Sequence, residues 1–377
     1  MTIIESGDTD HEHTPIPIHN DRILSVQSHV AFGYVGGKAA AFPLQCMGYD
    51  VDVVNTVNFS NHTGYGCFGG TKTNAEELVR IFDTMQQSGV LVADRLLTGY
   101  IPTAESLGSV RELVKKLKLS NPNLTYLLDP VLGDSGRLYV SADCVPVYRQ
   151  MLPLATIITP NWFEVEVLTE VSLTDLVSLR AALRKLHDLY HVSNVVISSI
   201  PLTKLSASVP SYLLPMQPMD GSIHAEYLIC IASSINDIGN LEGQPLSTVY
   251  AGCVRLIPGY FSGVGDLFSA LLLGHYHTPQ SNAPLSFSTP AKSYPPLAHA
   301  ASHSLSRTHA ILTLTNEFAS NLCLPSTDDE LDTREPERKS RRMKGRELRI
   351  IQGQDVFRRK EWDGVAMMQE WEGFWNE

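Results

Sequence analysis

Apolar stretches typical of buried strands alternate with amphipathic stretches along most of this chain. Strands are predicted at residues 23–28, 51–57, 95–100, 124–134, 155–160, 194–199, 225–232 and 248–257. Helices are predicted at residues 38–47, 75–87 and 104–118, from residue 161 onward, and at 266–275 and 299–322. A helix between two strands carries the chain back across a sheet, so this order favours parallel strands. The pattern predicts an α/β fold, doubly wound, with a mostly parallel sheet and helices on both faces.

Four segments do not follow this pattern. Residues 1–20 mix acidic, His and Pro residues and are predicted to form a disordered leader. Polar loop insertions near 206–220 and 278–297 interrupt an ordered domain over residues 22–325. The extension 326–377 is highly charged as far as residue 346, and we interpret that run as a solvated linker, with an acidic partner or a nuclear signal as alternatives. The extension is expected to end in a short strand at Leu348–Ile351 and a helix.

Charge and cysteine content exclude several classes of function. The 377 residues carry a formal net charge of −11, whereas a nucleic-acid-binding surface needs an excess of Lys and Arg. The six cysteines form no C-x-x-C pair, so neither a zinc cage nor a disulfide framework is predicted. No apolar run is long enough to span a membrane, and none follows the N-terminus. We therefore expect no nucleic-acid or membrane partner and a cytoplasmic protein, with the nucleus as an alternative location.

The stretch Phe261–Leu272 contains the sequence Gly263-Val264-Gly265-Asp266 immediately before an apolar helix. Two glycines allow a turn to bring its N–H groups close to an anion, and the positive end of the helix dipole faces that turn. Asp266 has two candidate roles, because its carboxylate can cap the helix or accept a proton beside a bound phosphate. An ordinary capped turn explains the stretch equally well. The stretch is neither a dinucleotide-binding fingerprint nor a Walker loop.

Polar residues also follow the ends of other predicted strands. Asp129 and Asp134 follow one strand, and Asn161 and Glu164 follow the next, one helical turn apart. Carboxylates at strand ends can hold a hard cation such as Mg²⁺, although a turn and a helix-capping box need no ion. The loop 58–66, rich in polar, Gly and aromatic residues, lies where α/β sheets place contacts to small molecules. A surface loop without a ligand is the alternative for that segment.

Taken in order, these segments resemble pyridoxal kinases of the ribokinase-like superfamily. The resemblance extends over about residues 22–322 and rests on Ser25–Val30, Gly33–Gly36, Phe42–Gln45, Phe59–Tyr65, Leu97–Tyr100, Asp129–Asp134, Ile158–Glu164 and Gly263–Phe268. It implies ATP-dependent phosphorylation of the 5′-hydroxymethyl group of pyridoxal, pyridoxine or pyridoxamine in vitamin B6 salvage. It also implies a homodimer.

The resemblance assigns a role to each matching residue. Asp266 is then the base, and the amides of Gly263, Val264 and Gly265 face the transferred phosphoryl group. The vitamer side comprises Ser28, which bonds the pyridine nitrogen, the apolar wall Val57 and Phe59, and the contacts Thr63 and Tyr100. The nucleotide side comprises Asn161, Ser198, Ser199 and Tyr139. Asp134 and Glu164 are the implied Mg²⁺ residues, and Asp129, Thr159 and Ser198 line an implied K⁺ site.

One residue departs from the family pattern, and two other functions are compatible with these motifs. Many relatives carry Thr where Val264 stands, so a hydroxyl contact to phosphate is absent here. A hydroxymethylpyrimidine-type kinase shares the Gly-x-Gly-Asp sequence, and a non-catalytic pyridoxal-binding regulatory protein would keep the pocket without turnover. Ser28, the Phe59–Tyr65 loop and Tyr100 favour the vitamer kinase over the first rival. The acidic residues Asp266, Asp134 and Glu164 argue against the second.

Overall fold

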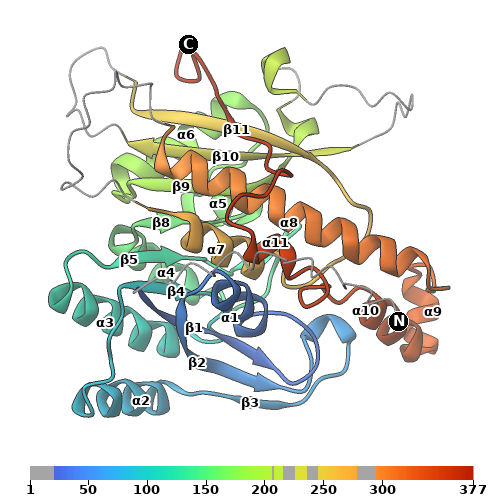
Figure 1. The fold of residues 1–377 in the computed structure, drawn as a ribbon, viewed down its shortest axis with the longest axis horizontal. Helices are drawn as coiled ribbons and strands as arrows, with labels where there is room; N and C mark the ends of the chain where they lie inside the picture. Colours follow the sequence, from blue (N-terminus) through green and yellow to red (C-terminus); the bar gives the residue numbers. More distant parts are fainter. Residues whose placement is uncertain (1–20, 206–207, 215–225, 236–244, 278–293, 377) are drawn as a thin grey trace, which may run out of the picture.

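A ten-stranded sheet with helices on both faces forms the centre of the computed structural model (Figure 1), which describes residues 21–205, 208–214, 226–235, 245–277 and 294–376. Six central strands are parallel, in the spatial order β9 (Asn194–Pro201), β8 (Ile157–Ile158), β5 (Thr125–Leu128), β4 (Arg95–Thr98), β1 (Arg22–Val30) and β2 (Asp50–Phe59). Antiparallel strands extend both edges: β3 (Gly70–Lys72) beside β2, and β10 (Tyr227–Ile235), β11 (Ser247–Arg255) and β12 (Gln369–Glu370) beyond β9. The predicted doubly wound, mostly parallel sheet is confirmed.

Each face of the sheet packs against its own set of helices. One face carries α2 (Ala75–Gln87), α3 (Ala104–Ser120), α4 (Cys144–Met151), α5 (Trp162–Thr169) and α6 (Leu176–Arg184). The other carries α1 (Gly37–Cys46), α7 (Val264–His275), α8 (Pro296–Ser320) and α11 (Asp355–Arg358). Short 3-10 or π turns lie at Thr63–Tyr65 (η1), Leu152–Leu154 (η2), Lys185–Leu189 (η3), Leu202–Lys204 (η4) and Ser211–Leu213 (η5).

Alternation along β1 shows how one strand serves two cores. Leu24 and Val26 point into the apolar cluster under α2–α6, whereas Ile23 belongs to the cluster under α1, α7 and α8. Successive side chains of a strand point to opposite faces, so a strand covered on both sides reads as an apolar run. The burial of all three residues explains why the sequence pattern located this strand.

The sheet order reverses beside β1. From β1 the chain moves outward to β2, then returns to β4 on the other side of β1 and continues through β5 and β8 to β9. In open α/β sheets, ligands bind outside the carboxyl ends of the strands at such a reversal. The carboxyl ends of β1, β2 and β4 are therefore the first place to look for a site.

Most predicted elements are present, with two changes near strand ends. The strand predicted at 124–134 ends at Leu128, and Gly133–Asp134 instead forms β6 of a hairpin with β7 (Arg137–Leu138). Ser135 and Gly136, at the turn of this hairpin, have φ values of 50° and 83°. A two-residue turn with positive φ matches the twist of a hairpin, which separates Asp134 from the preceding strand.

The prediction of a solvated linker over 326–346 is wrong. This segment forms α9 (Asp329–Arg334) and α10 (Pro336–Gly345), and Arg342 is only 4% exposed because it pairs with Asp332. The predicted strand at Leu348–Ile351 is also wrong, because none of these residues joins a strand, Ile350 and Ile351 lie in a turn, and the terminal strand is β12. Charge content misled the linker prediction, since a buried ion pair leaves no apolar pattern in the sequence.

The end of the chain packs on the domain rather than away from it. β12 pairs with β11, while Trp371 and Phe374 are 4% and 2% exposed in the cluster under α2–α6. The domain boundary near residue 325 stays a prediction. The predicted leader 1–20 lies outside the described residues, as do most of the insertions 206–220 and 278–297, although Pro296 and Leu297 already belong to α8.

Candidate active site

The turn before α7 is built around one glycine. Gly263 is the N-cap of α7 with φ 81°, and a Cβ at this position would lie 2.1 Å from the carbonyl oxygen of Tyr34. Only glycine fits both the left-handed backbone and this close approach. The first N–H groups of a helix have no partner within it, and they carry the positive end of its dipole. The turn thus presents a helix end whose first N–H groups, those of Val264, Gly265 and Asp266, are suited to an anion.

Asp266 does not cap its own helix. Its Oδ2 accepts a hydrogen bond of 2.7 Å from the backbone N–H of Gly36, at the start of α1, and no side chain caps α7. The interpretation of Phe261–Leu272 as a turn with an aspartate cap is therefore wrong. Burial raises the pKa of Asp266, while the Gly36 hydrogen bond opposes that rise. A carboxylate with a raised pKa is a better proton acceptor near neutral pH than an exposed one.

Gly36 joins Asp266 to the end of β1. A Cβ on Gly36 would lie 2.2 Å from both the carbonyl oxygen and the Oγ of Ser28, and its φ is 53°. Ser28 is 8% exposed and stands directly beside Val57 of β2 in the sheet register. A register shift between Gln27 and Ser28 produces this pairing. The structure thus brings the predicted base Asp266, Ser28 and the wall residue Val57 to one end of the sheet.

The other predicted vitamer residues lie on the segments that follow β2 and β4. Phe59 ends β2 and packs against Phe68, with ring centroids 5.1 Å apart. Thr63 is exposed in η1. Tyr100 follows β4 and is half-buried, and its carbonyl oxygen accepts the Thr56 hydroxyl at 2.7 Å. Because β1 lies between β2 and β4, these segments leave the sheet from the two strands on either side of Ser28.

A second polar group lies beneath the first turn of α7. The Ser269 hydroxyl donates to Asp129 Oδ2 at 2.9 Å and lies 2.8 Å from the Thr159 hydroxyl. Burial raises the pKa of Asp129, and the nearby charge of Asp266 raises it further. Among the ion pairs of the described residues, none neutralises Asp129. A buried carboxylate beside two hydroxyls and without a cationic partner fits a monovalent cation.

Asn161 and Glu164 form the capping box of α5. Glu164 Oε2 accepts the Asn161 N–H, Asn161 Oδ1 accepts the Glu164 N–H, and both distances are 2.9 Å. Glu164 Oε1 also accepts the N–H of Leu132 at 2.9 Å and of Gly133 at 3.4 Å, while Asn161 Nδ2 donates to the Gly133 carbonyl. Burial raises the pKa of Glu164 well above its ordinary value, and the Asp129 charge adds to that rise. The capping box that the spacing allowed is therefore present.

Asp134 stands next to this group on the β6–β7 hairpin. Its Oδ1 accepts the Ser135 N–H at 2.7 Å, and the side chain is partly exposed. No cluster of three or more His, Cys, Asp or Glu side chains able to hold a metal ion occurs in the described ranges. Mg²⁺ in kinases commonly takes one or two carboxylates and completes its shell with phosphates and water. Asp134 with Glu164 matches such a partial donor set.

The remaining predicted nucleotide residues lie farther along the sheet edge. Ser198 and Ser199 are partly exposed near the end of β9, and the Ser198 N–H donates to the Pro160 carbonyl, next to Asn161. Tyr139 follows the β6–β7 hairpin, is 47% exposed, and interacts with the Tyr260 hydroxyl. Tyr139 thus links the hairpin to the segment before α7.

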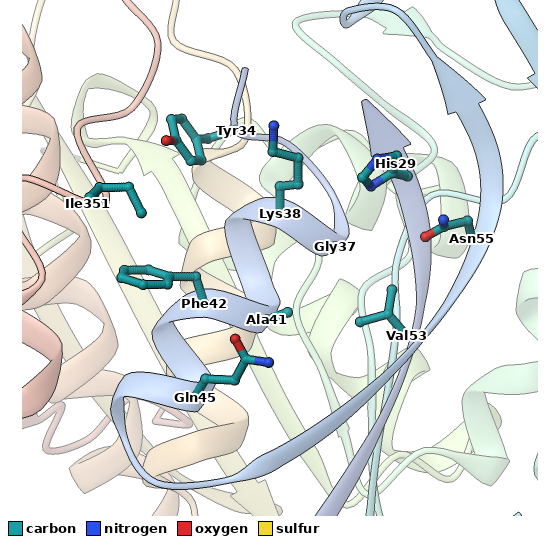
Figure 2. A pocket seen from close by; sticks show the side chains of 10 residues that line it. All are labelled: His29, Tyr34, Gly37, Lys38, Ala41, Phe42, Gln45, Val53, Asn55 and Ile351. Carbon is teal, nitrogen blue, oxygen red and sulfur yellow. The ribbon is translucent and has the colours of Figure 1, made fainter. Parts of the chain in front are cut away.

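A cavity of about 520 Å³ lies beside this site but is not part of it (Figure 2). His29, Val53 and Asn55 face it from β1 and β2, and α1 closes the opposite side with residues that include Lys38 and Phe42. None of the predicted site residues lines it. Ser28 and His29 point to opposite faces of β1, which explains why Ser28 belongs to the site and His29 to this cavity.

Sequence reasoning missed two groups that complete the site. Ser269 follows Asp266 by three residues, so both lie on one face of α7, and that spacing was available in the sequence. The second group is Glu347, which comes from the C-terminal extension and contacts His62 and Tyr65. No sequence signal joins residues almost three hundred positions apart.

Comparison with known proteins decides the family. A phosphomethylpyrimidine kinase family model matches residues 48–219. The pyridoxal kinase of Arabidopsis thaliana is 40% identical over 260 residues, which cover 69% of this chain and 75% of the plant protein. The chain belongs to the pyridoxal kinase family. The pyridoxal kinase of Homo sapiens is 38% identical and is covered over 79% of its length.

Solved pyridoxal kinases share the fold over nearly the whole chain. The enzyme from Leishmania donovani in complex with ADP and pyridoxamine superposes with a TM-score of 0.71 at 28% identity, covering 93% of this chain and 99% of the other. The complex of the same enzyme with ADP and pyridoxine gives a TM-score of 0.70. In this pyridoxal kinase family member, no helix of the described segments is long and apolar enough to cross a membrane.

Proposed function

We propose that this protein is a pyridoxal kinase that transfers the terminal phosphoryl group of ATP to the 5′-hydroxymethyl group of pyridoxal, pyridoxine or pyridoxamine. The observation that carries the proposal is the position of Asp266 at the N-terminus of α7, hydrogen-bonded to Gly36, the glycine that packs closely against Ser28. A proton acceptor and a helix end suited to an anion are thereby brought to the end of β1, beside the sheet reversal. Phosphoryl transfer needs mainly positioning and charge stabilisation, which this arrangement supplies.

In the proposed reaction, Asp266 and the turn before α7 have different catalytic roles. Asp266 Oδ2 is held by Gly36, which leaves Oδ1 to accept the proton of the attacking hydroxyl. The N–H groups of Gly263, Val264 and Gly265 stabilise the negative charge that develops on the transferred phosphoryl group. The Val264 side chain packs against the cluster under α1, α7 and α8, so its contribution comes from the backbone. The missing threonine hydroxyl therefore does not remove the anion site.

The vitamer would be held between strands β1, β2 and β4. Ser28 bonds the pyridine nitrogen, Val57 and Phe59 form the apolar wall, and Thr63 and Tyr100 contact the ring substituents. These assignments are supported by the sheet register that places Ser28 beside Val57 and by the position of all five residues around the reversal. Asn161, Ser198, Ser199 and Tyr139 are the proposed nucleotide residues, supported by their succession along the same edge.

Two cations complete the proposal. Asp134 and Glu164 would hold Mg²⁺ directly or through water, and the ion would neutralise phosphate charge. Asp129, Thr159 and Ser198 would bind K⁺, supported by the buried Asp129 carboxyl beneath α7, which accepts the Ser269 hydroxyl and has no ion pair within the described part of the chain. The Glu164 carboxylate already accepts hydrogen bonds from three backbone N–H groups, so Asp134 is the better candidate for direct contact with Mg²⁺.

A coupled assay of the purified protein with ATP, Mg²⁺ and K⁺ tests the function. Pyridoxal, pyridoxine, pyridoxamine and hydroxymethylpyrimidine are compared at equal concentrations, with omission of each cation as a control. We expect turnover of at least one vitamer that exceeds turnover of the pyrimidine. Faster phosphorylation of hydroxymethylpyrimidine would favour that rival. Binding of pyridoxal without any ATP-dependent product would indicate the regulatory protein.

Assembly and location complete the proposed function. We expect a homodimer, on the resemblance to the family, and light scattering coupled to gel filtration measures its mass. A monomer at micromolar concentration would contradict this. We expect the protein in the cytoplasm, with the nucleus as the alternative location. Fluorescence microscopy of a tagged chain tests this.

A further inference from the structure

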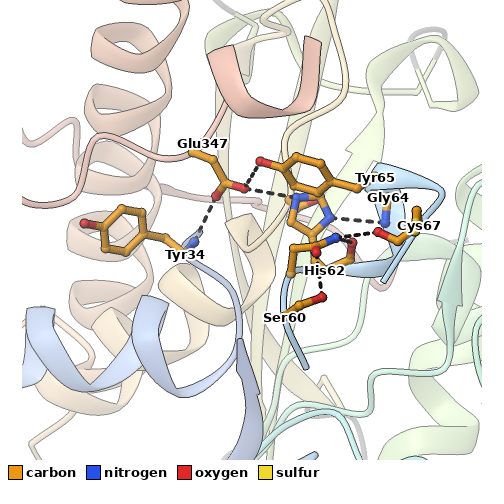
Figure 3. Close-up of polar contacts among 9 residues, drawn as sticks. Tyr34, Ser60, His62, Gly64, Tyr65, Cys67 and Glu347 are labelled. Atoms are coloured by element: carbon orange, nitrogen blue, oxygen red, sulfur yellow. Dashed lines mark hydrogen bonds and ion pairs between the residues drawn. The ribbon is translucent and has the colours of Figure 1, made fainter. Parts of the chain in front are cut away.

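One carboxylate of the C-terminal extension reaches into the loops of the site (Figure 3). Glu347 Oε2 accepts the backbone N–H of Tyr34 at 2.9 Å, and its Oε1 accepts the Tyr65 hydroxyl at 2.8 Å. The Nε2 atom of His62 lies 3.3 Å from the same Oε1. The side chains of Glu347 and His62 are both only 10% exposed. A single carboxylate thus joins the turn before α1 to the loop that carries Thr63.

This contact is built for a carboxylate rather than for any polar group. A backbone N–H and a histidine N–H can only donate here, and an ionised carboxylate can only accept. A Cβ on Gly33, whose φ is 97°, would lie 2.5 Å from Glu347 Oε1, so the turn fits closely around the carboxylate. Burial raises the pKa of the Tyr65 hydroxyl, and the Glu347 charge raises it further, which keeps that hydroxyl a donor.

The other nitrogen of His62 extends the network toward the anion-binding turn. His62 Nδ1 accepts the Gly64 N–H at 3.2 Å and lies 3.3 Å from the Ser262 hydroxyl. Because Gly64 can only donate through its N–H, Nδ1 must carry no proton. The neutral ring then carries its proton on Nε2, which donates to Glu347. Ser262 immediately precedes the N-cap of α7, so the network spans from the extension to the proposed phosphate site.

Two basic residues of the same segment also contact the loops of the site. The guanidinium of Arg346 lies 5.8 Å from the centre of the Phe261 ring, and a Cβ on Gly259 would lie 2.8 Å from its Cζ. Lys339 of α10 approaches Gly66 on the far side of the vitamer loop. The extension therefore packs against both loops that flank the proposed vitamer, and Glu347 supplies the hydrogen bonds.

We propose that Glu347 is a positioning residue that fixes the Nε2–H tautomer of His62 and thereby holds Thr63 and its loop in place for the vitamer. The proposal rests on the proposed kinase function for its kinetic consequence. Its structural consequence, the tautomer of His62, does not depend on turnover.

Replacement Glu347→Gln tests this with minimal change of shape. If the new amide NH₂ faces Tyr34, two donors oppose each other. If it faces His62, the ring must move its proton to Nδ1, where it opposes the Gly64 N–H. Either orientation loosens the loop. We expect the KM for pyridoxal to rise about tenfold, as for loss of one hydrogen bond to a charged group. We expect kcat and the KM for ATP to change less than about twofold, because Glu347 contacts neither α5 nor the β6–β7 hairpin.

The matched control is Glu337→Gln, which changes an exposed glutamate in the first turn of α10. It should leave both KM values unchanged. Nitrogen-15 NMR of the histidine side chains reports the tautomer, with the His62 signal assigned by its loss in a His62→Gln variant. We expect Nε2–H in the native chain and a measurable Nδ1–H population in Glu347→Gln. Thermal unfolding followed by circular dichroism verifies that each variant is folded.

The outcomes separate the two proposals. A native chain that phosphorylates no vitamer refutes the kinase function, while the tautomer measurement still decides the role of Glu347. Native turnover with an unchanged vitamer KM in Glu347→Gln, or a native His62 that carries its proton on Nδ1, overturns the positioning role. If Glu347→Gln does not fold, Tyr65→Phe removes one donor alone and should raise the vitamer KM about two- to threefold. An unchanged KM in that variant also overturns the proposal.

Discussion

The role of Asp266 can be separated from its structural contact by comparing two substitutions. In Asp266→Asn, the amide oxygen can still accept the Gly36 N–H, which now donates to Oδ2 over 2.7 Å. The amide cannot accept the proton of a hydroxyl, so only the base is removed. In Asp266→Ala, the Gly36 N–H loses its acceptor as well. The pair therefore distinguishes chemistry from the architecture of the turn.

The structure and general energetics give the expected sizes. A positioned general base contributes roughly 10²- to 10⁴-fold in rate, which corresponds to about 3–5 kcal/mol of transition-state stabilisation. Both variants should lose kcat within that range. A part-buried N–H without an acceptor costs about 1–3 kcal/mol. Only Asp266→Ala should therefore lower the free energy of unfolding by that amount, less the stabilisation that both variants gain from removing the charge near Asp129.

Steady-state kinetics with pyridoxal and ATP measures kcat. Calorimetric titration measures the affinity for pyridoxal, and urea unfolding measures the free energy of unfolding. Pyridoxal affinity should stay within about twofold in Asp266→Asn, because Ser28 and the strand register are untouched. If Asp266→Asn keeps kcat within about threefold of the native chain, Asp266 is not the base. If both variants unfold at the same urea concentration, the argument from the Gly36 contact is wrong.

Three further predictions concern the framework of the site. Gly263→Ala should lower the free energy of unfolding by at least about 1–3 kcal/mol, because its φ of 81° and a neighbouring carbonyl exclude a Cβ; Gly265→Ala, which meets its nearest atom at 3.9 Å, is the control. Trp371→Ala should lower the free energy of unfolding in urea by about 3–5 kcal/mol, because the ring is 4% exposed. The control is Val177→Ala, at a side chain that is 69% exposed, which should change the free energy of unfolding by less than about 0.5 kcal/mol. Burial lowers the pKa of His187, so stability from its neutral ring is complete above about pH 6.5 and is lost as pH falls, by about 1.4 kcal/mol per pH unit.

Each of these predictions has a result that contradicts it. Equal stability of the two glycine variants would show that the turn before α7 relaxes around a methyl group. A cost below about 1 kcal/mol for Trp371→Ala would mean that the end of the chain is not part of the cooperative core. For the histidine, His187→Gln should flatten the pH dependence below pH 6.5, as urea unfolding at several pH values measures. An unchanged slope would assign the acid sensitivity to other groups.

Local pattern alone was sufficient to predict the strands and helices that are covered on both sides. Strand β1 is an apolar run because its two faces enter two different cores, and such a run is visible without knowledge of its neighbours. The Gly263–Asp266 sequence likewise signalled a helix end suited to an anion. The same pattern could not decide whether Asp266 caps α7, since that depends on whether another N–H is nearer. Gly36, from the start of α1, supplies that N–H.

Prediction failed where charged groups are buried by partners that only folding brings into contact. The 326–346 run carries so many charges that a linker was the natural interpretation, yet Arg342 is buried against Asp332. Burial of a charge requires a partner of opposite charge in three dimensions, and hydrophobic periodicity carries no information about it.

The sequence by itself determined the α/β order of the elements, the glycines of the turn before α7 and, through the resemblance, the candidate vitamer residues. Only the tertiary structure decided that Ser28 stands beside Val57, that Gly36 donates to Asp266, and that Glu347 reaches the loop of His62. Strand patterns depend on neighbours two residues away, whereas these contacts depend on how the sheet and the C-terminal extension bring remote segments together. A hydrogen-bond network between such segments exists only after the chain has folded.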